Sequence, residues 1–431
     1  MAKAMIRLSD LKKTYRYFKK NGLLPAFYAA LERIQNKNVC YEKRIVSPQE
    51  QERQRKTLWN EEEWFSILVP AYETEVRQFR EMIDSVLAQT YERFELIIAD
   101  ASDSDKLLEV MKYYKDSRIR YLRLEENRGI SENTNEALQA VRGSYVGLLD
   151  HDDTLEADAL YRVMEAIHDY RETYGEGPQV LYSDEDKGDA DMSRFYEPHL
   201  KNKFNLDLIL SNNYICHFMV MRTPLIRSLG FRSEYDGAQD HDLVLRAAAE
   251  LWERTETIVH VPYVLYHWRC HDGSTAENPQ SKAYAYEAGK RAVEDFCRQR
   301  GWKVQVTHTR HLGFFRVEYA GDILEQRSDL AAVGGRIVSR GRITGGAYEA
   351  DGHVLYEGLP VHFSGTMHRA VLQQDVDAVD IRNMRVRPQL RPLLEQIRNA
   401  QPDPVAASLH FGREAAKLGY RLLWDPLMEK R

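Results

Sequence analysis

The chain has 431 residues, of which 43% are hydrophobic and 29% are charged. These values are those of an ordinary globular protein with a large core, and they exclude a disordered or fibrous chain. The formal net charge of −6 gives no sign of a nucleic-acid partner, and none is expected.

Residues 1–61 are predicted to form an N-terminal helical extension. Apolar side chains recur at nearly helical spacing, with lysines and arginines between them, at Ile6, Leu8, Leu11, Tyr15 and Phe18. Basic amphipathic helices serve two purposes, and both stay open here. The helices could pack on the main domain, or they could dock on a membrane surface or a partner.

Residues 62–318 are predicted to form the main domain, because apolar strands alternate with helices from Trp64 onward. The expected strands are 65–69, 94–99, 119–124 and 145–149, and the expected helices are 76–88, 105–115 and 131–141. Continuous apolar strands separated by helices indicate an α/β fold with a mostly parallel sheet and helices on both faces. In such sheets ligands bind beyond the carboxyl ends of the strands.

Polar and acidic residues gather at these strand ends. Strand one continues into Pro70, Ala71, Tyr72 and Glu73, strand two ends at Asp100, and strand four is followed by Asp150, His151, Asp152 and Asp153. Clustered carboxylates repel one another, and a divalent cation relieves that repulsion. Because Mg²⁺ and Mn²⁺ prefer hard oxygen ligands, Asp150 and Asp152 are predicted to bind one of them. The alternative is that Asp152 or Asp153 caps the helix expected from about residue 157.

At this point the sequence resembles glycosyltransferase family 2. The resemblance rests on several stretches in the expected order, namely 66–72, 84–91, 95–100, 127–131 with Asn135, and the D-x-D segment 148–153. It implies the GT-A fold, an inverting mechanism and a nucleotide-sugar donor. Asp100 would bind the pyrimidine base, with Ala71 and Tyr72 lining the pocket and Pro70, Glu73 and Asn127 beside it. Asp150 would lie near the ribose and the metal, and Asp152 would ligate the metal.

The chain also departs from the family pattern. Ala101-Ser102-Asp103 follows Asp100 where Asp-Gly-Ser is common, Glu73 stands where Asn is common, and Thr134 stands where Arg is common. These departures concern the details of the nucleotide contacts.

The acceptor half begins after the next expected strand, 180–183, which runs into Asp184 and Glu185. Further along, Gln239 and Asp240 precede a helix, and the resemblance implies that Asp240 is the general base. Inverting transfer needs one such carboxylate to take the proton of the attacking hydroxyl. The alternative for Asp240 is a helix N-cap, and Asp242 is expected to be structural.

The segment 266–275 is expected to close the donor site. The resemblance implies that Arg269 and Ser274 hold the diphosphate and that His271 completes the metal shell, with His267 as the packed alternative. Arginine suits phosphate because its planar fork binds two oxygens. Asp184, Glu185, Tyr214, His217 and Gln239 are candidates for sugar or acceptor contacts, although Tyr214 and His217 could equally be core residues.

Residues 319–431 are predicted to form a small α/β region, with a strand at 331–338 and a helix at 403–418. The order resembles a truncated second family 2 domain that lacks its nucleotide half. A structural or dimerising role and acceptor-glycan binding both stay open, and so does homo-oligomerisation.

The sequence thus predicts a metal-dependent glycosyltransferase that moves a sugar from a UDP- or dTDP-sugar to a bacterial surface glycan or lipid-linked glycan. The alternative is an inactive pseudo-glycosyltransferase that acts as a scaffold or glycan-binding module. The four cysteines are scattered and no apolar run approaches the roughly 20 residues of a membrane span. A cytoplasmic location is therefore expected, with peripheral contact at the inner face of the plasma membrane as a further expectation.

Overall fold

The computed structural model describes residues 15, 17–19, 21–36, 41–270 and 283–430. They fall into two compact units. The large unit comprises Tyr41–Phe204 and Asn213–Phe296, and the small unit comprises Met1–Cys40, Asn205–Asn212 and Cys297–Arg431.

This division differs from the boundaries expected at 61 and 318, for two physical reasons. Arg44 and Gln54 both donate to the buried carboxylate of Asp158, so the segment after residue 40 is tied to the large unit. At the other end, β10 (Val304–His308) pairs with β11 (Phe315–Tyr319), so the polypeptide just before 319 belongs to the small unit.

The large unit is built on a nine-stranded sheet with the order β3-β2-β1-β4-β8-β6-β9-β5, and β7 pairs with β6. The strands are β1 Phe65–Ala71, β2 Phe94–Asp100, β3 Ile119–Arg123, β4 Tyr145–Leu148, β5 Thr154–Leu155, β6 Val180–Gly188, β7 Phe195–His199, β8 Met219–Arg222 and β9 Ile258–Arg269. The α/β class is confirmed, and β3 to β4 are parallel as expected. However, β8 runs antiparallel to both β4 and β6, so the sheet beyond β4 is mixed.

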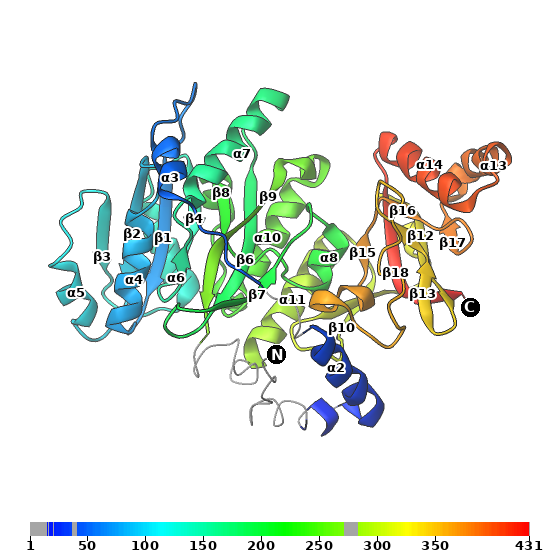
Figure 1. The fold of residues 1–431 in the computed structure, drawn as a ribbon, viewed down its shortest axis with the longest axis horizontal. Coiled ribbons are helices and arrows are strands. Elements are labelled where there is room, and N and C mark those ends of the chain that lie inside the picture. The colour runs from blue at the N-terminus through cyan, green and yellow to red at the C-terminus, as the bar shows by residue number, and fades with distance from the viewer. Residues whose placement is uncertain (1–14, 16, 20, 37–40, 271–282, 431) are drawn as a thin grey trace. The chain divides into compact units, whose positions relative to one another are not determined.

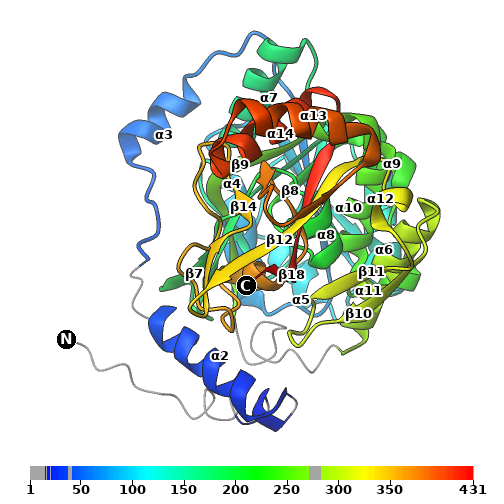
Figure 2. The same cartoon turned by 90° about the vertical axis from the view of Figure 1, so that its right-hand side faces the viewer.

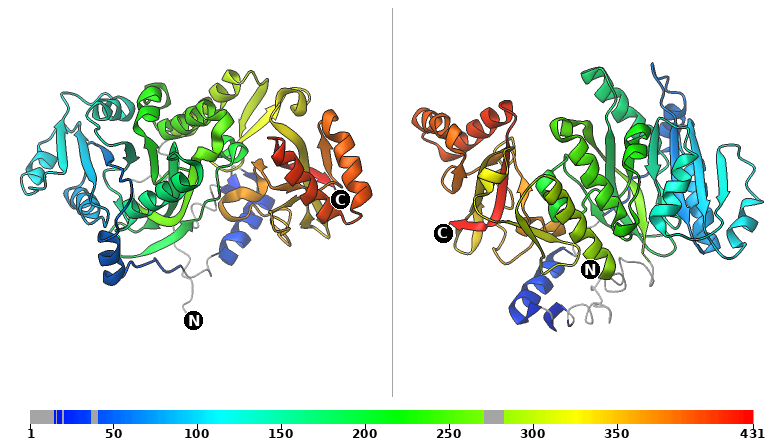
Figure 3. Two further views of the ribbon diagram at one scale, coloured as in Figure 1. Left: turned by 90° about the horizontal axis from the view of Figure 1, so that it is seen from above. Right: turned by 180° about the vertical axis from the view of Figure 1, so that it is seen from behind.

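Helices cover both faces of this sheet (Figures 1 and 3). They are α3 Pro48–Arg55, α4 Val76–Leu87, α5 Lys106–Met111, α6 Ile130–Gln139, α7 Ala159–Tyr174, α9 Thr223–Leu229, α10 Gln239–Glu250 and α11 Ala283–Gln299. The apolar stripe of α4 shows why they bind the sheet. Phe79, Met82, Ile83 and Val86 are all 0% exposed, and each such buried side chain contributes about 1.5–3 kcal/mol.

The small unit has its own sheet, with the order β13-β12-β18-β15 and with β17 paired to β12. Its strands are β12 Leu330–Ser339, β13 Arg342–Gly345, β15 Gln374–Asp375, β17 Met384–Val386 and β18 Arg421–Lys430, beside the short pair β14 Ala347–Tyr348 and β16 Ala378–Val379. The helices are α2 Leu23–Asn36, α8 Leu206–Ser211, α12 Ile323–Gln326, α13 Arg391–Ala400 and α14 Pro404–Lys417.

In Figure 2, α13 and α14 lie together beside this sheet. A separate hydrophobic core that includes Leu394, Phe411 and Trp424 lies beneath them. The strand expected at 331–338 and the helix expected at 403–418 are both present, as β12 and α14. The small unit therefore folds around side chains of its own.

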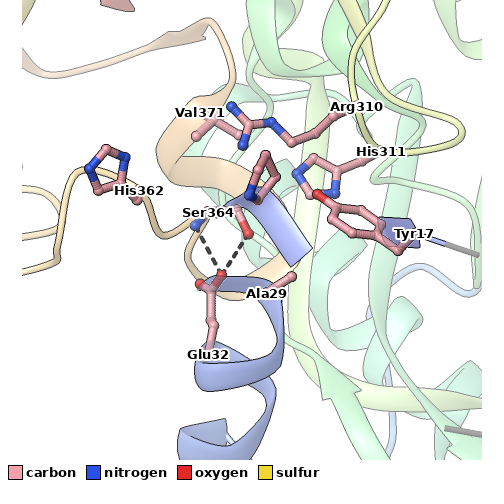
Figure 4. Close-up of a pocket in the computed structure, with 9 residues that line it drawn as sticks. Tyr17, Ala29, Glu32, Arg310, His311, His362, Ser364 and Val371 are labelled. Atoms are coloured by element: carbon pink, nitrogen blue, oxygen red, sulfur yellow. Dashed lines mark hydrogen bonds between the residues drawn. The ribbon is translucent and has the colours of Figure 1, made fainter. Parts of the chain in front are cut away.

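Helix α2 packs within the small unit. The Glu32 carboxylate accepts hydrogen bonds from the Ser364 amide and hydroxyl at 3.0 and 2.9 Å (Figure 4). It also accepts one from the Gly365 amide at 2.6 Å. The ring of Tyr28 stacks on His362 with 4.6 Å between centroids. This face of α2 therefore packs against the C-terminal region, whereas the packing alternative named the main domain. Among the described residues, no helix is both long enough and apolar enough to cross a bilayer.

Candidate functional site

The parallel strands bring the predicted residues to one edge of the large sheet. Ala71 at the end of β1 is in register with Asp100 at the end of β2, and β4 pairs with the other side of β1 just before Asp150. Because parallel strands end at the same edge, Asp100 and Asp150 flank the carboxyl end of β1, as the sequence predicts.

Asp100 is fully buried and already has several partners. Its Oδ1 accepts from the Ser102 amide at 2.8 Å, while its Oδ2 accepts from the Arg123 guanidinium at 2.6 Å and from the Tyr121 hydroxyl. Burial and the neighbouring Asp100 carboxylate raise the pKa of Tyr121, so its hydroxyl keeps its proton. A nucleobase donor would have to share Oδ1, because Oδ2 is occupied by two β3 side chains that the sequence did not single out.

Glu73 shapes the loop that follows β2. Its backbone adopts φ +47°, and its carboxylate accepts from both the amide and the hydroxyl of Ser104 at 2.8 Å. These hydrogen bonds lower the pKa of Glu73. Glu73 therefore holds the loop around Ser102 and Ser104. Its neighbour Tyr72 is 44% exposed, and that exposed ring is available to stack on a base.

Asn127 organises the turn before α6. Its Oδ1 accepts from the Gly129 amide at 3.1 Å and from the Asn133 side chain at 2.9 Å. Gly129 has φ +93°, and a Cβ placed there would lie 2.6 Å from the Asp236 carboxylate. The same carboxylate accepts from the Ser131 amide at 3.3 Å. Glycine is thus required for the turn to close against Asp236.

The three aspartates of the D-x-D segment have different surroundings. The Asp150 side chain is 50% exposed and that of Asp152 is 24% exposed, so both remain accessible. Asp153 is buried, and it accepts from the Tyr266 hydroxyl at 2.6 Å and the Arg269 amide at 2.7 Å. Neither Asp152 nor Asp153 caps α7, because the N-cap position of that helix is Asp158. Asp153 instead connects the D-x-D segment to β9 through these two hydrogen bonds.

Electrostatics favour a cation here. The protein atoms around Asp150 partly desolvate its carboxylate and so raise its pKa, and the nearby Asp152 and Asp240 carboxylates raise it further. Burial and the neighbouring Asp152 and Asp150 carboxylates raise the pKa of Asp153. Asp150 is thus an accessible oxygen ligand whose ionisation is disfavoured by its surroundings, and Mg²⁺ or Mn²⁺ would stabilise its charged form.

Arg269 is placed differently from the expected diphosphate clamp. Its side chain is 0% exposed, and its guanidinium donates to the carbonyls of Asp152 at 2.6 Å and Ala190 at 2.8 Å. A third nitrogen lies 2.7 Å from the Glu81 carboxylate. The guanidinium is therefore buried, and it holds the D-x-D segment through the backbone carbonyl of Asp152. Ser274 and His271 lie outside the described residues.

His267 follows the packed alternative. It is 1% exposed, and its ring nitrogens lie 2.6 Å from Asp186 and 3.3 Å from Glu156. Burial alone would raise the pKa of Glu156, but His267 and Lys43 hold it at about 2. The imidazole is therefore occupied inside the unit by two carboxylates.

Asp240 lies in the first turn of α10 and does not cap the helix. The N-cap position is Ala238, and the Asp240 Oδ2 accepts from the Asn213 amide group at 2.7 Å. Gln239 accepts from the Gly237 amide at 2.9 Å. The carboxylate of Asp242 binds Arg232 and Arg246, which confirms its structural role.

His217 joins the two acidic regions. Its Nδ1 lies 3.0 Å from Glu185 and its Nε2 lies 3.8 Å from Asp150, while its ring stacks on Tyr266 at 4.4 Å. Cys216 continues this chain of contacts, because its Sγ is 3.6 Å from His217 Nε2 and 3.8 Å from Asp240 Oδ2.

Glu185 is buried beneath this chain. It contacts His199 at 3.1 Å and Lys201 at 3.5 Å. Burial alone would raise the pKa of Glu185, but Lys201, His199 and His217 hold it well below its usual range. The carboxylate is therefore ionised and supports His217 from behind.

Two acceptor candidates are structural. Tyr214 is 1% exposed and meets Tyr182 edge to face, so it is a core residue. Strand β6 does not end at residue 183 as expected but continues to Gly188. Asp184 is therefore buried within a strand, where it accepts from the Lys201 amide at 2.8 Å and contacts His260 at 2.7 Å.

Sequence reasoning missed Cys216, Asn213 and Tyr266 as neighbours of the acidic residues. Tyr266 and His267 are consecutive on β9 and both are buried, so the period of two along the strand does not single out Tyr266. Nothing local marks Cys216 or Asn213, because only the tertiary fold brings them beside Asp240.

Part of the chain is similar to known proteins. The model of "Glycosyl transferase family 2" matches residues 66–230. The "Uncharacterized protein y4gI" of Sinorhizobium fredii is 38% identical over 234 residues, which are 53% of this chain and 25% of that protein. The "O-antigen biosynthesis protein RfbC" of Myxococcus xanthus is 33% identical over 258 residues, 59% of this chain and 19% of that protein.

The chain thus spans a quarter or less of the length of these two relatives. Among solved structures, S. aureus TarS 1-349 in complex with UDP-GlcNAc is 20% identical with a TM-score of 0.42, and the match covers 54% of this chain and 66% of that one.

Proposed function

We propose that this chain is a member of glycosyl transferase family 2, whose model matches residues 66–230, and that its large unit is an inverting, metal-dependent glycosyltransferase. It moves a sugar from a nucleoside-diphosphate donor to a hydroxyl group of a bacterial surface glycan or lipid-linked glycan. One observation carries the proposal. Asp150, Asp152 and Asp240 gather at the same site, and each remains partly exposed.

The donor side of the proposal rests on the D-x-D segment. Asp150 and Asp152 would hold Mg²⁺ or Mn²⁺, because both offer accessible oxygen ligands. When bound, the ion neutralises the charge that develops on the departing diphosphate. Two contacts hold the D-x-D segment against β9. Asp153 accepts from the Arg269 amide, and the Arg269 guanidinium donates to the Asp152 carbonyl. The exposed ring of Tyr72 would stack on the base, uracil or thymine.

The acceptor side rests on Asp240. Its Oδ2 accepts from Asn213, so Oδ1 is the oxygen left to take a proton. The acceptor hydroxyl transfers its proton to this oxygen as its own oxygen attacks the anomeric carbon and the bond to the diphosphate breaks. One displacement inverts the anomeric centre. His217 contacts Asp150 and the adjacent Cys216 contacts Asp240, so His217 would contact either the acceptor or the transferred sugar.

Thermal-shift binding on the full chain tests the donor site. UDP and dTDP are each added with and without Mn²⁺ to the wild type, to Asp152→Ala and to the exposed control Asp169→Ala. We expect a metal-dependent rise in Tm that disappears only in Asp152→Ala. If neither nucleotide shifts the wild type, the enzyme proposal fails and the pseudo-glycosyltransferase takes its place.

A second variant tests the base. In Asp240→Asn the Asn213 contact can be kept, but the proton acceptor is lost. Transfer should fall by about 10²–10⁴-fold while nucleotide binding is unchanged. Equal activity of the variant and the wild type would remove Asp240 from the mechanism.

We also propose roles for the remaining parts. The small unit, including the region that resembles a truncated second domain, is assigned a structural role without transferase activity. Helix α2 would contact an anionic membrane at the inner face, since Leu23, Leu24 and Phe27 are 75%, 58% and 55% exposed and the preceding sequence is basic. Co-sedimentation with anionic but not neutral vesicles tests this contact, and its loss in Leu24→Glu with Phe27→Glu is expected.

A further inference from the structure

We propose that Cys216 and His217 form a binding site for a thiophilic divalent cation of the Zn²⁺ class, beside Asp240. The two residues are adjacent in the loop before β8, and Cys216 is not in a disulfide. Ligand atoms of Glu185, Cys216 and His217 all lie within 4.8 Å of one another. This site takes a different ion from the one that suits Asp150 and Asp152, because it offers sulfur and nitrogen.

The distances fit one tetrahedral ion. Zn²⁺ lies at about 2.3 Å from sulfur and about 2.0–2.1 Å from nitrogen, which places two such ligands about 3.6 Å apart at the tetrahedral angle. The Cys216 Sγ and His217 Nε2 are 3.6 Å apart. The Asp240 Oδ2 is 3.8 Å from the same sulfur, and a small side-chain shift would bring it in as an oxygen ligand.

The histidine is oriented in advance. Glu185 lies 3.0 Å from Nδ1, so it fixes the tautomer in which Nδ1 carries the proton and Nε2 presents its lone pair toward Cys216. The ring of Tyr266 stacks on the imidazole with 12° between the planes. A carboxylate behind a histidine ligand is the usual outer shell of a zinc site. Coordination would release the Cys216 thiol proton to solvent, and the sulfur would bind as thiolate.

A cation bound at Cys216 and His217 should affect sugar transfer, and this expectation rests on the proposed function. A cation held by Cys216 would draw the Asp240 carboxylate toward itself, and a coordinated carboxylate is a poor proton acceptor. Zn²⁺ should therefore inhibit transfer even when Mn²⁺ saturates the D-x-D segment. Metal binding itself needs no donor or acceptor, so a failure of the proposed function leaves the binding test intact.

The test is a Co²⁺ titration of the metal-stripped full chain, followed by the near-ultraviolet absorption of a cobalt–thiolate bond. The wild type and the control Cys297→Ala, which removes a different and buried cysteine, should both show this band, and Cys216→Ala should not. Ions bound by Asp150 and Asp152 give no such band, because they have no sulfur ligand. A wild type without the band, or a band that persists in Cys216→Ala, would overturn the proposal.

A second variant keeps the test decisive if Cys216→Ala does not fold. Glu185→Gln removes the charge behind His217 and should weaken Co²⁺ affinity by about 10–100-fold, with the band still present at saturation. Unchanged affinity in a folded Glu185→Gln would count against the site. Where transfer activity is measurable, Zn²⁺ should inhibit the wild type and Cys297→Ala but not Cys216→Ala, and equal inhibition of all three would refute the assigned consequence.

Discussion

The replacement Arg269→Met distinguishes a structural arginine from a phosphate-binding one. The side chain is 0% exposed, and the replacement removes two hydrogen bonds to backbone carbonyls and an ion pair at 2.7 Å with Glu81. Breaking a buried pair costs about 3–5 kcal/mol. The Glu81 side chain is 32% exposed and can be hydrated, so we expect the lower end, about 3 kcal/mol.

For a domain of this size each kcal/mol lowers Tm by about 2–4 °C, so Arg269→Met should lower it by about 6–12 °C. Thermal unfolding without any ligand measures this, and Arg254→Met, which removes an ion pair that is 48% exposed on both sides, is the matched control with an expected change near zero. If Arg269→Met instead keeps its Tm and loses only UDP affinity, the guanidinium faces the diphosphate and the structural argument is refuted.

Three further predictions concern the rest of the chain. Arg327→Met leaves two buried carboxylate partners uncompensated and should destabilise the small unit by about 3–5 kcal/mol in urea unfolding, whereas the exposed Arg385→Ala should not. Burial raises the pKa of Asp375 to about 7, above its unfolded value, so the small unit should lose stability as pH rises from about 4 through 7; a wild-type profile no steeper than that of Asp375→Asn would contradict this. Gly129→Ala places a Cβ 2.6 Å from Asp236 at φ +93° and should cost about 1–3 kcal/mol and weaken nucleotide binding; wild-type stability would show that the turn can open freely.

In the D-x-D region, local sequence predicted the roles of some residues and not of others. Asp150 and Asp152 were predicted as accessible oxygen ligands from two features alone, a buried strand and the carboxylates that follow it, and the structure places both at the open edge. The roles of Asp153 and Arg269 were not predicted. Asp153 accepts from the Arg269 amide on β9, and the Arg269 guanidinium donates to the Asp152 carbonyl. In both contacts the two partners are more than a hundred residues apart in sequence.

The sequence by itself determined the alternation of strands and helices, the parallel direction of the first four strands and the acidic residues at the strand ends. Each of these follows from side-chain periodicity within a few consecutive residues. Only the tertiary structure decided the direction of β8, the burial of Arg269 and Tyr214, and the meeting of Cys216, His217 and Asp240. These depend on which distant segments become neighbours, because a side chain's burial and partners are set by residues that its own segment does not contain.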